Sequence, residues 1–231
     1  STTGNDLSIT LTNSGNALVG PVSLSTLTTG ALGGTVDLDN GTTPLELAAS
    51  TLGGALSVDA NGLTITGGIT APGMDFSNAG AVTLGAASVL LDASGGTGDV
   101  TFGSQSIDGQ ALDSNGLQIL AQGSDAITVG AIGAGTRLTG VSLQTGAGGD
   151  ITTAGVTTLG AQDYQVGAGG SIVVQGTYRT VGTAGADAIV FDGNVSLAAN
   201  TSVETAGGGG DDVTLLADVT NASGNRDVVL N

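Results

Sequence analysis

One glycine-rich phrase occurs twice in this chain at an interval of 21 residues. The segment Gly146–Ile151 (GAGGDI) returns as Gly167–Ile172 (GAGGSI), and a Thr-rich alternating stretch lies between the two copies. That interval is too long for a hairpin and is typical of one turn of a β-solenoid. We therefore predict that residues 1–231 form a single continuous stack of such turns.

Short apolar-polar-apolar triplets recur throughout the chain, as in Leu45-Glu46-Leu47. Alternation in a strand turns the two apolar side chains toward a core and the polar one toward water. Helices are disfavoured, because Gly interrupts nearly every window of ten residues. Five dipeptides that tolerate positive φ predict turns: Asn40-Gly41, Asn61-Gly62, Asp108-Gly109, Asn115-Gly116 and Asp192-Gly193.

Two architectures fit short strands joined by turns, a meander of hairpins and a β-solenoid. Strands of three or four residues make poor hairpins, whereas stacked parallel coils pair them on both sides. Two further recurrences favour the solenoid: Gly123–Ile127 returns after 62 residues as Gly185–Ile189, close to three times 21, and Gly98–Thr101 returns loosely as Asp211–Thr214. We expect an all-β chain with roughly 20–25 residues per coil, some 11 coils and a length of about 50 Å.

Charge and composition exclude several classes of protein. The chain has 20 acidic residues, three arginines (Arg137, Arg179 and Arg226), and no Lys, His or Cys, for a net charge of −17. Nucleic acids and anionic membrane surfaces require cationic side chains, so neither is an expected partner. No apolar run suits a membrane-spanning helix. The carboxylates serve either solubility or divalent-cation binding.

The same absences argue against catalysis. Without His or Lys there is no His-based triad, no His metal site, no phosphate-binding P-loop and no Schiff base. The acidic pairs Asp37/Asp39 and Asp211/Asp212 have no cationic side chain nearby in sequence to stabilise developing charge. We predict that the chain is not an enzyme, and we assign no catalytic, cofactor-binding or metal-binding residue.

Calcium and carbohydrate binding remain alternatives. Residues Gly182–Ile189 match the calcium-binding RTX nonapeptide at all but one position, and Gly207–Thr214 match it less well, but such sites require tandem copies. Tyr164 and Tyr178 either fill the core or stack on a sugar ring. Asn-x-Ser/Thr sequons, which are only permissive for glycosylation, occur at four positions: Asn40, Asn194, Asn200 and Asn221.

Three segments resemble repeats of filamentous haemagglutinin-like exoproteins and autotransporter passengers: Asn13–Leu24, Gly149–Thr153 and Val156–Tyr164. The resemblance implies a right-handed parallel β-helix that is secreted to the bacterial cell surface or beyond and acts in adhesion or biofilm formation. The secretion domain of that family, with its Asn-Pro signatures, is not matched. We therefore expect a fragment or repeat block of a longer protein.

The expected function is structural or adhesive, as an adhesin stalk or extracellular fibre. One alternative is a self-assembling filament or surface-layer subunit, because terminal coils expose unpaired strand edges. The expected partners are accordingly the protein itself, surface glycans, or host or neighbouring cells, with no nucleic acid and no membrane insertion. The second alternative is a calcium- or carbohydrate-binding solenoid module.

Overall fold

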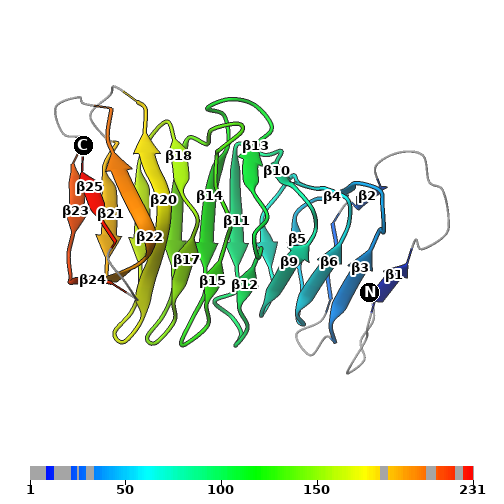
Figure 1. Cartoon of the computed structure of the whole chain (residues 1–231). Coiled ribbons are helices and arrows are strands. Elements are labelled where there is room, and N and C mark those ends of the chain that lie inside the picture. The colour runs from blue at the N-terminus through cyan, green and yellow to red at the C-terminus, as the bar shows by residue number, and fades with distance from the viewer. Residues whose placement is uncertain are drawn as a thin grey trace.

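The chain folds as a stack of short parallel strands (Figure 1). The computed structural model describes residues 9–12, 22–24, 26–29, 34–182, 187–206, 212–221 and 226–230, and within these ranges it is all-β with no helix. In Figure 1 the coils follow one another in sequence order along the axis, and the two termini lie at opposite ends. The predicted β-solenoid is confirmed.

The strands of the described residues form three parallel sheets, which we number first to third. The first sheet contains, in spatial order, β1 (Ile9–Thr12), β3 (Val36–Asp39), β6 (Leu56–Asp59), β9 (Met74–Asn78), β12 (Val100–Thr101), β15 (Ile127–Thr128), β17 (Ile151–Thr153), β20 (Ser171–Thr180), β22 (Asn194–Glu204) and β24 (Val219–Asn221), with β18 (Val156–Thr158) on β20 and β25 (Val228–Leu230) on β22.

The second and third sheets complete each coil. The second sheet contains β2 (Val22–Leu24), β4 (Leu45–Leu47), β7 (Leu63–Ile65), β10 (Val82–Leu84) and β13 (Ile107–Gly109). The third sheet contains β5 (Ser50–Thr51), β8 (Ile69–Thr70), β11 (Ser88–Asp92), β14 (Gly116–Leu120), β16 (Gly140–Gln144), β19 (Gln162–Gln165), β21 (Ile189–Asp192) and β23 (Val213–Leu215).

The second sheet continues past β13 through isolated bridges. Ile107 pairs with Ile132, and Ile132 with Val156 of β18. Val156 then pairs with Tyr178 in the second half of β20, and Tyr178 with Val203 of β22. The two long strands β20 and β22 therefore run through a corner of the coil, with a register shift between Val174 and Gly176 where the backbone turns.

Coil length follows from the register of the first sheet. The shortest coil, from Leu56 to Met74, spans 74 − 56 = 18 residues, and the coil from Val100 to Ile127 spans 127 − 100 = 27. The range is wider than the predicted 20–25 residues. Long coils reduce their number, so the chain makes about eight turns rather than 11. At about 4.8 Å per turn the rod is about 40 Å long.

The register confirms one of the sequence recurrences and overturns two. Ile151 pairs directly with Ile172, so the 21-residue phrase is one coil. Ile127 lies in the first sheet but Ile189 lies in the third, and the same displacement separates Val100 from Val213. The 62-residue recurrence is therefore not three coils, because the same Asp-containing turn precedes strands at two different corners.

The core is narrow and is filled by one layer of side chains from each sheet. In the column Val100, Ile127, Ile151 and Ile172 every side chain is fully buried. The five aromatic residues lie inside the coil, where Phe76 stacks on Phe102 at 4.8 Å and Tyr164 stacks on Phe191 at 4.9 Å between ring centroids. The predicted inward-facing apolar pairs are confirmed.

Glycine corners allow neighbouring coils to meet backbone against backbone. The Gly167 amide donates to the Gly146 carbonyl at 3.2 Å, and the Gly148 amide donates to the Ala168 carbonyl at 3.0 Å. A Cβ atom added to Gly170 would lie 2.1 Å from the Gly149 carbonyl oxygen, and one on Gly149 would lie 2.4 Å from that of Asp125. The corner therefore tolerates no side chain at these positions.

Three of the five predicted turn dipeptides are confirmed. Gly41, Gly62 and Gly193 have φ values of 55°, 112° and 146°. The prediction is wrong for Gly109 and Gly116, which lie in β13 and β14. At these two positions the small residue serves close packing, because a Cβ on Gly109 would lie 2.9 Å from the Asn115 Oδ1 atom.

We predict that Gly170→Ala lowers the free energy of unfolding by about 1–3 kcal/mol, because the added methyl group would collide with a backbone carbonyl of the preceding coil. The matched control is Gly95→Ala, where a Cβ would meet nothing within 4 Å. Urea unfolding followed by circular dichroism measures both. Equal stability of the two variants would show that the corners are not packed as described.

Candidate functional surfaces

The outer faces of the sheets carry mainly small polar side chains in register from coil to coil. On the first sheet one outward column follows the rod axis, with Thr101, Thr128 and Thr152 in consecutive coils. The full column is Asp37, Ser57, Asp75, Thr101, Thr128, Thr152, Val173, Ser196 and Thr220. Such a face is repetitive and polar, with a spacing of about 4.8 Å.

Several carboxylates bind the backbone of the next coil. The Asp99 Oδ1 atom accepts a hydrogen bond from the Ala126 amide, and the Asp150 Oδ1 atom accepts one from the Ser171 amide, each at 2.7 Å. Asp108 accepts from two amides one coil further on. Asp150 is thus a corner residue, as predicted, and these acidic side chains join coils together.

The acidic pairs form no metal centre in the structure. Asp37 and Asp39 lie on the outward face of β3, where the Asp39 Oδ1 atom accepts from the Gly41 amide at 2.9 Å. Asp212 is exposed, and Asp211 lies outside the described residues. Within the described ranges no group of three or more His, Cys, Asp or Glu side chains could hold a metal ion. Calcium binding stays a prediction without an assigned site.

The better RTX-like segment contains one buried carboxylate. Asp187 is 5% exposed, and its Oδ2 atom has no hydrogen-bond partner. Gly182 leaves room for that carboxylate, since a Cβ there would lie 2.3 Å from it. Residues 183–186, together with residues 207–211 of the second segment, lie outside the described residues.

Asp125 is a second buried carboxylate at a corner. It is 9% exposed, and its Oδ2 atom also has no hydrogen-bond partner. Burial raises the pKa of this carboxyl group, the nearby charge of Asp99 raises it further, and a hydrogen bond from the Gly98 backbone partly opposes both effects. Asp125 and Asp187 occupy the same position in the two copies of the 62-residue recurrence, which explains why the sequence repeats at different corners.

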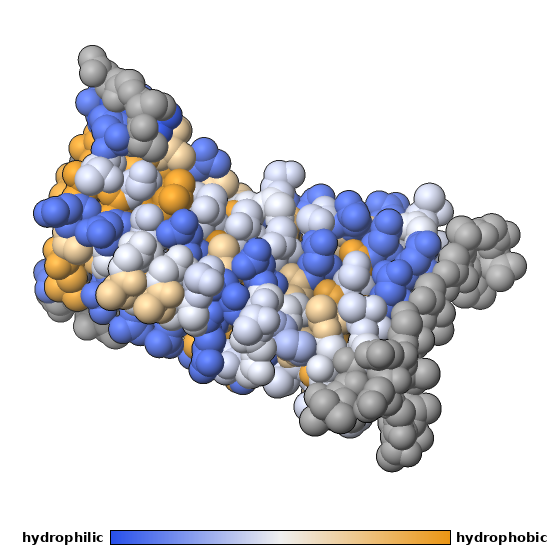
Figure 2. Space-filling model, turned by 90° about the horizontal axis from the view of Figure 1, so that it is seen from below, coloured by the Kyte–Doolittle hydropathy of each residue, from blue (hydrophilic) through white to orange (hydrophobic). Residues whose placement is uncertain are grey.

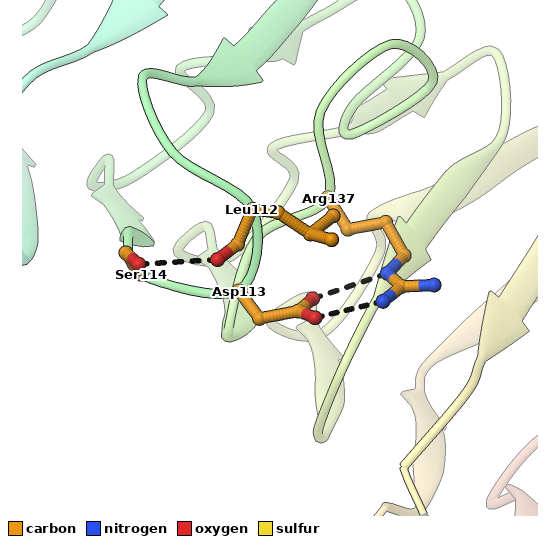
Figure 3. Close-up of polar contacts among 4 residues, drawn as sticks. All are labelled: Leu112, Asp113, Ser114 and Arg137. Carbon is orange, nitrogen blue, oxygen red and sulfur yellow. Dashed lines mark hydrogen bonds and ion pairs between the residues drawn. The ribbon is translucent and has the colours of Figure 1, made fainter.

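The most elaborate surface feature is the loop of residues 110–115, between β13 and β14. Arg137 and Asp113 form a two-point ion pair, with Nε–Oδ1 and Nη2–Oδ2 distances of 3.1 and 2.7 Å (Figure 3). This contact raises the pKa of the Arg137 guanidinium. The Asp113 amide also donates to the Arg137 carbonyl at 3.1 Å, so one residue is held through both its backbone and its side chain.

The same loop is anchored below and exposed above. Buried Asn115 donates to the Ala86 carbonyl at 2.7 Å and accepts from the Ala111 amide. Asp113 has a φ of 56°, which is the only positive φ of a non-glycine residue in the described ranges. Leu112, at the outer end of the loop, is 59% exposed. Strained backbone of this kind is characteristic of functional surfaces and persists only where neighbours hold it.

Neither tyrosine can stack on a sugar, because both rings are fully buried. The Tyr164 hydroxyl donates to Gln162 Oε1 at 2.9 Å, and the Tyr178 hydroxyl contacts the Thr153 side chain and carbonyl. Burial raises the pKa of Tyr178 to about 12 and that of Tyr164 well above its ordinary value. Both hydroxyls therefore remain protonated donors at physiological pH, inside the core.

Buried Gln162 completes this polar network. Its Nε2 atom donates to the carbonyls of Val156 and Arg179 and to the Thr158 hydroxyl, at 3.2, 2.9 and 3.1 Å. The sequence analysis missed Gln162 because it looked for inward positions only among apolar residues. Its place in the alternation of Gln162–Gln165, two residues before Tyr164, was the available signal.

One sequon asparagine is committed to a turn. Asn40 is 6% exposed, and its side-chain amide donates to the carbonyls of Thr43 and Pro44 at 3.1 and 2.8 Å. Asn194, Asn200 and Asn221 are exposed. The depressions on the described surface lie on the outer faces of the coils, as with the one lined by Asp59, Ser77 and Gln105. No helix that could cross a membrane is present in the described part of the chain.

The chain matches no protein-family model, no curated protein and no solved structure. The likeness to filamentous haemagglutinin-like repeats therefore rests on the three segments quoted above and stays a prediction. The fold is shown by the structure itself.

We predict that Asp125→Asn stabilises the protein at neutral pH. A raised pKa means that the folded state binds the proton more tightly than the unfolded state, so the stability of the native chain falls as pH rises through the folded pKa. The advantage of the variant should disappear below about pH 4, where the unfolded carboxyl is also protonated. Urea unfolding at several pH values tests this, with exposed Asp218→Asn as the control. A variant that is less stable at neutral pH would contradict the prediction.

We also predict that Arg137→Met loosens residues 110–115 without unfolding the rod. Removing the ion pair releases Asp113, whereas an exposed pair contributes only about 0–1 kcal/mol to overall stability. Hydrogen exchange should become faster within the loop and stay unchanged in the strands. The control is Arg179→Met, which removes the longer 3.7 Å contact with Glu204. Unchanged exchange in the loop of Arg137→Met would show that the ion pair does not hold it.

Proposed function

We propose that this chain is a structural and adhesive rod segment of a large secreted protein, serving as an adhesin stalk or extracellular fibre at a bacterial surface. The observation that carries the proposal is the unbroken column of parallel coils, whose first sheet alone connects β1 to β24. A solenoid of this kind holds its two ends at a set distance, because every coil packs on its neighbours.

Cross-coil contacts support a rigid spacer rather than a flexible linker. Each interior strand of the three sheets pairs on both sides, and carboxylates such as Asp99 and Asp150 add bonds between coils. The aromatic stacks Phe76–Phe102 and Tyr164–Phe191 connect coils through the core. Bending the rod would break several of these contacts at once.

The surface supports adhesion through many weak contacts. Outward Thr and Ser columns offer hydroxyl groups at regular intervals, which suits extended polar ligands such as surface glycans. The loop of residues 110–115 adds a preorganised element that presents Leu112. Preorganisation favours binding because less conformational entropy is lost on contact. The net charge of −17 keeps such a β-rich surface soluble.

A distance measurement tests the spacer role. The chain has no Cys, so Ser57→Cys and Ser196→Cys can carry two spin labels on the outward column of the first sheet. The register separates them by six coil steps, or about 29 Å between backbones. We expect one narrow distance distribution near this value. A broad distribution would remove the rigid-rod proposal.

A binding measurement tests the adhesive role. Beads coated with the intact chain should adhere to glycan-coated surfaces or cells more strongly than beads coated with unfolded chain. Leu112→Ser should weaken adhesion if the loop makes contact, whereas Ser57→Ala changes only one member of a repeated column and serves as control. Equal adhesion by folded and unfolded chain would reject an adhesive function while leaving the spacer role intact.

A further inference from the structure

The last coil exposes apolar side chains that interior coils bury. The described residues contain five exposed large hydrophobic side chains, and four of them lie in this coil: Leu216 (60%), Val219 (42%), Val229 (49%) and Leu230 (53%). The fifth is Leu112. Figure 2 shows hydrophobic residues gathered most densely at the C-terminal end, while the rest of that face is mainly polar. An apolar cluster of this kind on a highly charged chain marks an interaction site.

The same coil presents three open strand edges. β23 pairs only with β21, and both β24 and β25 pair only with β22. These three strands extend the third sheet, the first sheet and the column that continues the second sheet. Within the described ranges, their other edges have backbone groups without a partner strand. Natural proteins normally cover or charge such edges.

The first coil presents the matching edges at the opposite end of the rod. β1 pairs only with β3, and β2 pairs only with β4. In the third sheet the corresponding position is Thr28, which bridges to Thr51 of β5. Each of the three edges at the C-terminal end therefore has a counterpart in the same column at the N-terminal end.

We propose that the last coil is a docking surface for the first coil of a second copy of this chain, so that rods join head to tail. In this arrangement β24 pairs with β1, β25 pairs with β2, and β23 lies against the Thr28 segment. Every new pairing is parallel, as are the strand pairings inside the rod. The inference rests on the proposed rod and names its partner.

Head-to-tail joining fits these edges better than tail-to-tail joining. A copy turned end over end would meet each C-terminal strand in antiparallel orientation and would exchange columns of different width. A head-to-tail contact uses two different surfaces and does not close, so it produces an open filament rather than a dimer.

Charge sets the conditions for this assembly. A chain of net charge −17 repels its copies, and the exposed Asp218 and Asp227 lie in the last coil itself. Screening reaches a Debye length of about 30 Å at 0.01 M salt and about 8 Å at 0.15 M. Added salt should therefore lengthen the filaments at a given protein concentration.

Sedimentation velocity of the full chain at rising concentration tests the proposal. We expect a monomer at about 0.01 M salt and a broad series of longer species at about 0.15 M. Val219→Lys/Leu230→Lys, which places charges on the open face, should remain monomeric. Leu112→Lys is the matched control, because it charges an equally exposed leucine away from the ends and should assemble like the wild type. Circular dichroism confirms that each variant is folded.

A mixing experiment distinguishes the two orientations. Labelled Val219→Lys/Leu230→Lys keeps an intact first coil, so it should sediment with unlabelled wild-type filaments and shorten them when it occupies their ends. Failure of the folded variant to join the wild type would overturn head-to-tail docking, as would its assembling alone like the wild type. A wild-type chain that stays monomeric at all concentrations would also overturn it. In that case an unchanged, narrow spin-label distance would leave the rod itself standing.

Discussion

Parallel backbone pairing between successive coils is the interaction on which the rest of this structure depends. It brings coils to a distance at which corners can meet only as backbone on backbone, as Gly170 does over Gly149. The many glycines therefore follow from the pairing distance. The same distance allows a single layer of Val, Leu and Ile to fill the interior, so the chain builds a continuous core with few aromatic residues.

The pairing also decides what polar groups do. Asp99, Asp108 and Asp150 lie where an amide of the next coil has no strand partner, and each carboxylate satisfies it. In the core, Gln162 joins two tyrosines and two coils through hydrogen bonds that only one register allows. A narrow apolar core by itself specifies register weakly, because one Val layer packs on another in several ways.

The sequence was sufficient to predict the fold class, the inward and outward positions and the 21-residue coil, because alternation and turn chemistry are local. It could not assign the coils elsewhere: Ile127 and Ile189 follow similar turns and yet belong to different sheets. The loop of residues 110–115 was equally hidden. Asp113 and Arg137 lie 24 residues apart, and their contact depends on the length of a coil that the sequence does not mark.

A stack of coils differs from a globular domain in having no internal reason to stop. The pairing that satisfies every interior strand leaves its last strands half satisfied, and the core column that is closed between coils is open at the end, where Val219 and Leu230 face outward. Such an end is stable only if something covers it or if repulsion keeps copies apart. With 20 acidic residues against three basic ones, the chain carries that repulsion over its whole length. The balance between edge pairing and charge therefore sets whether rods stay single or join.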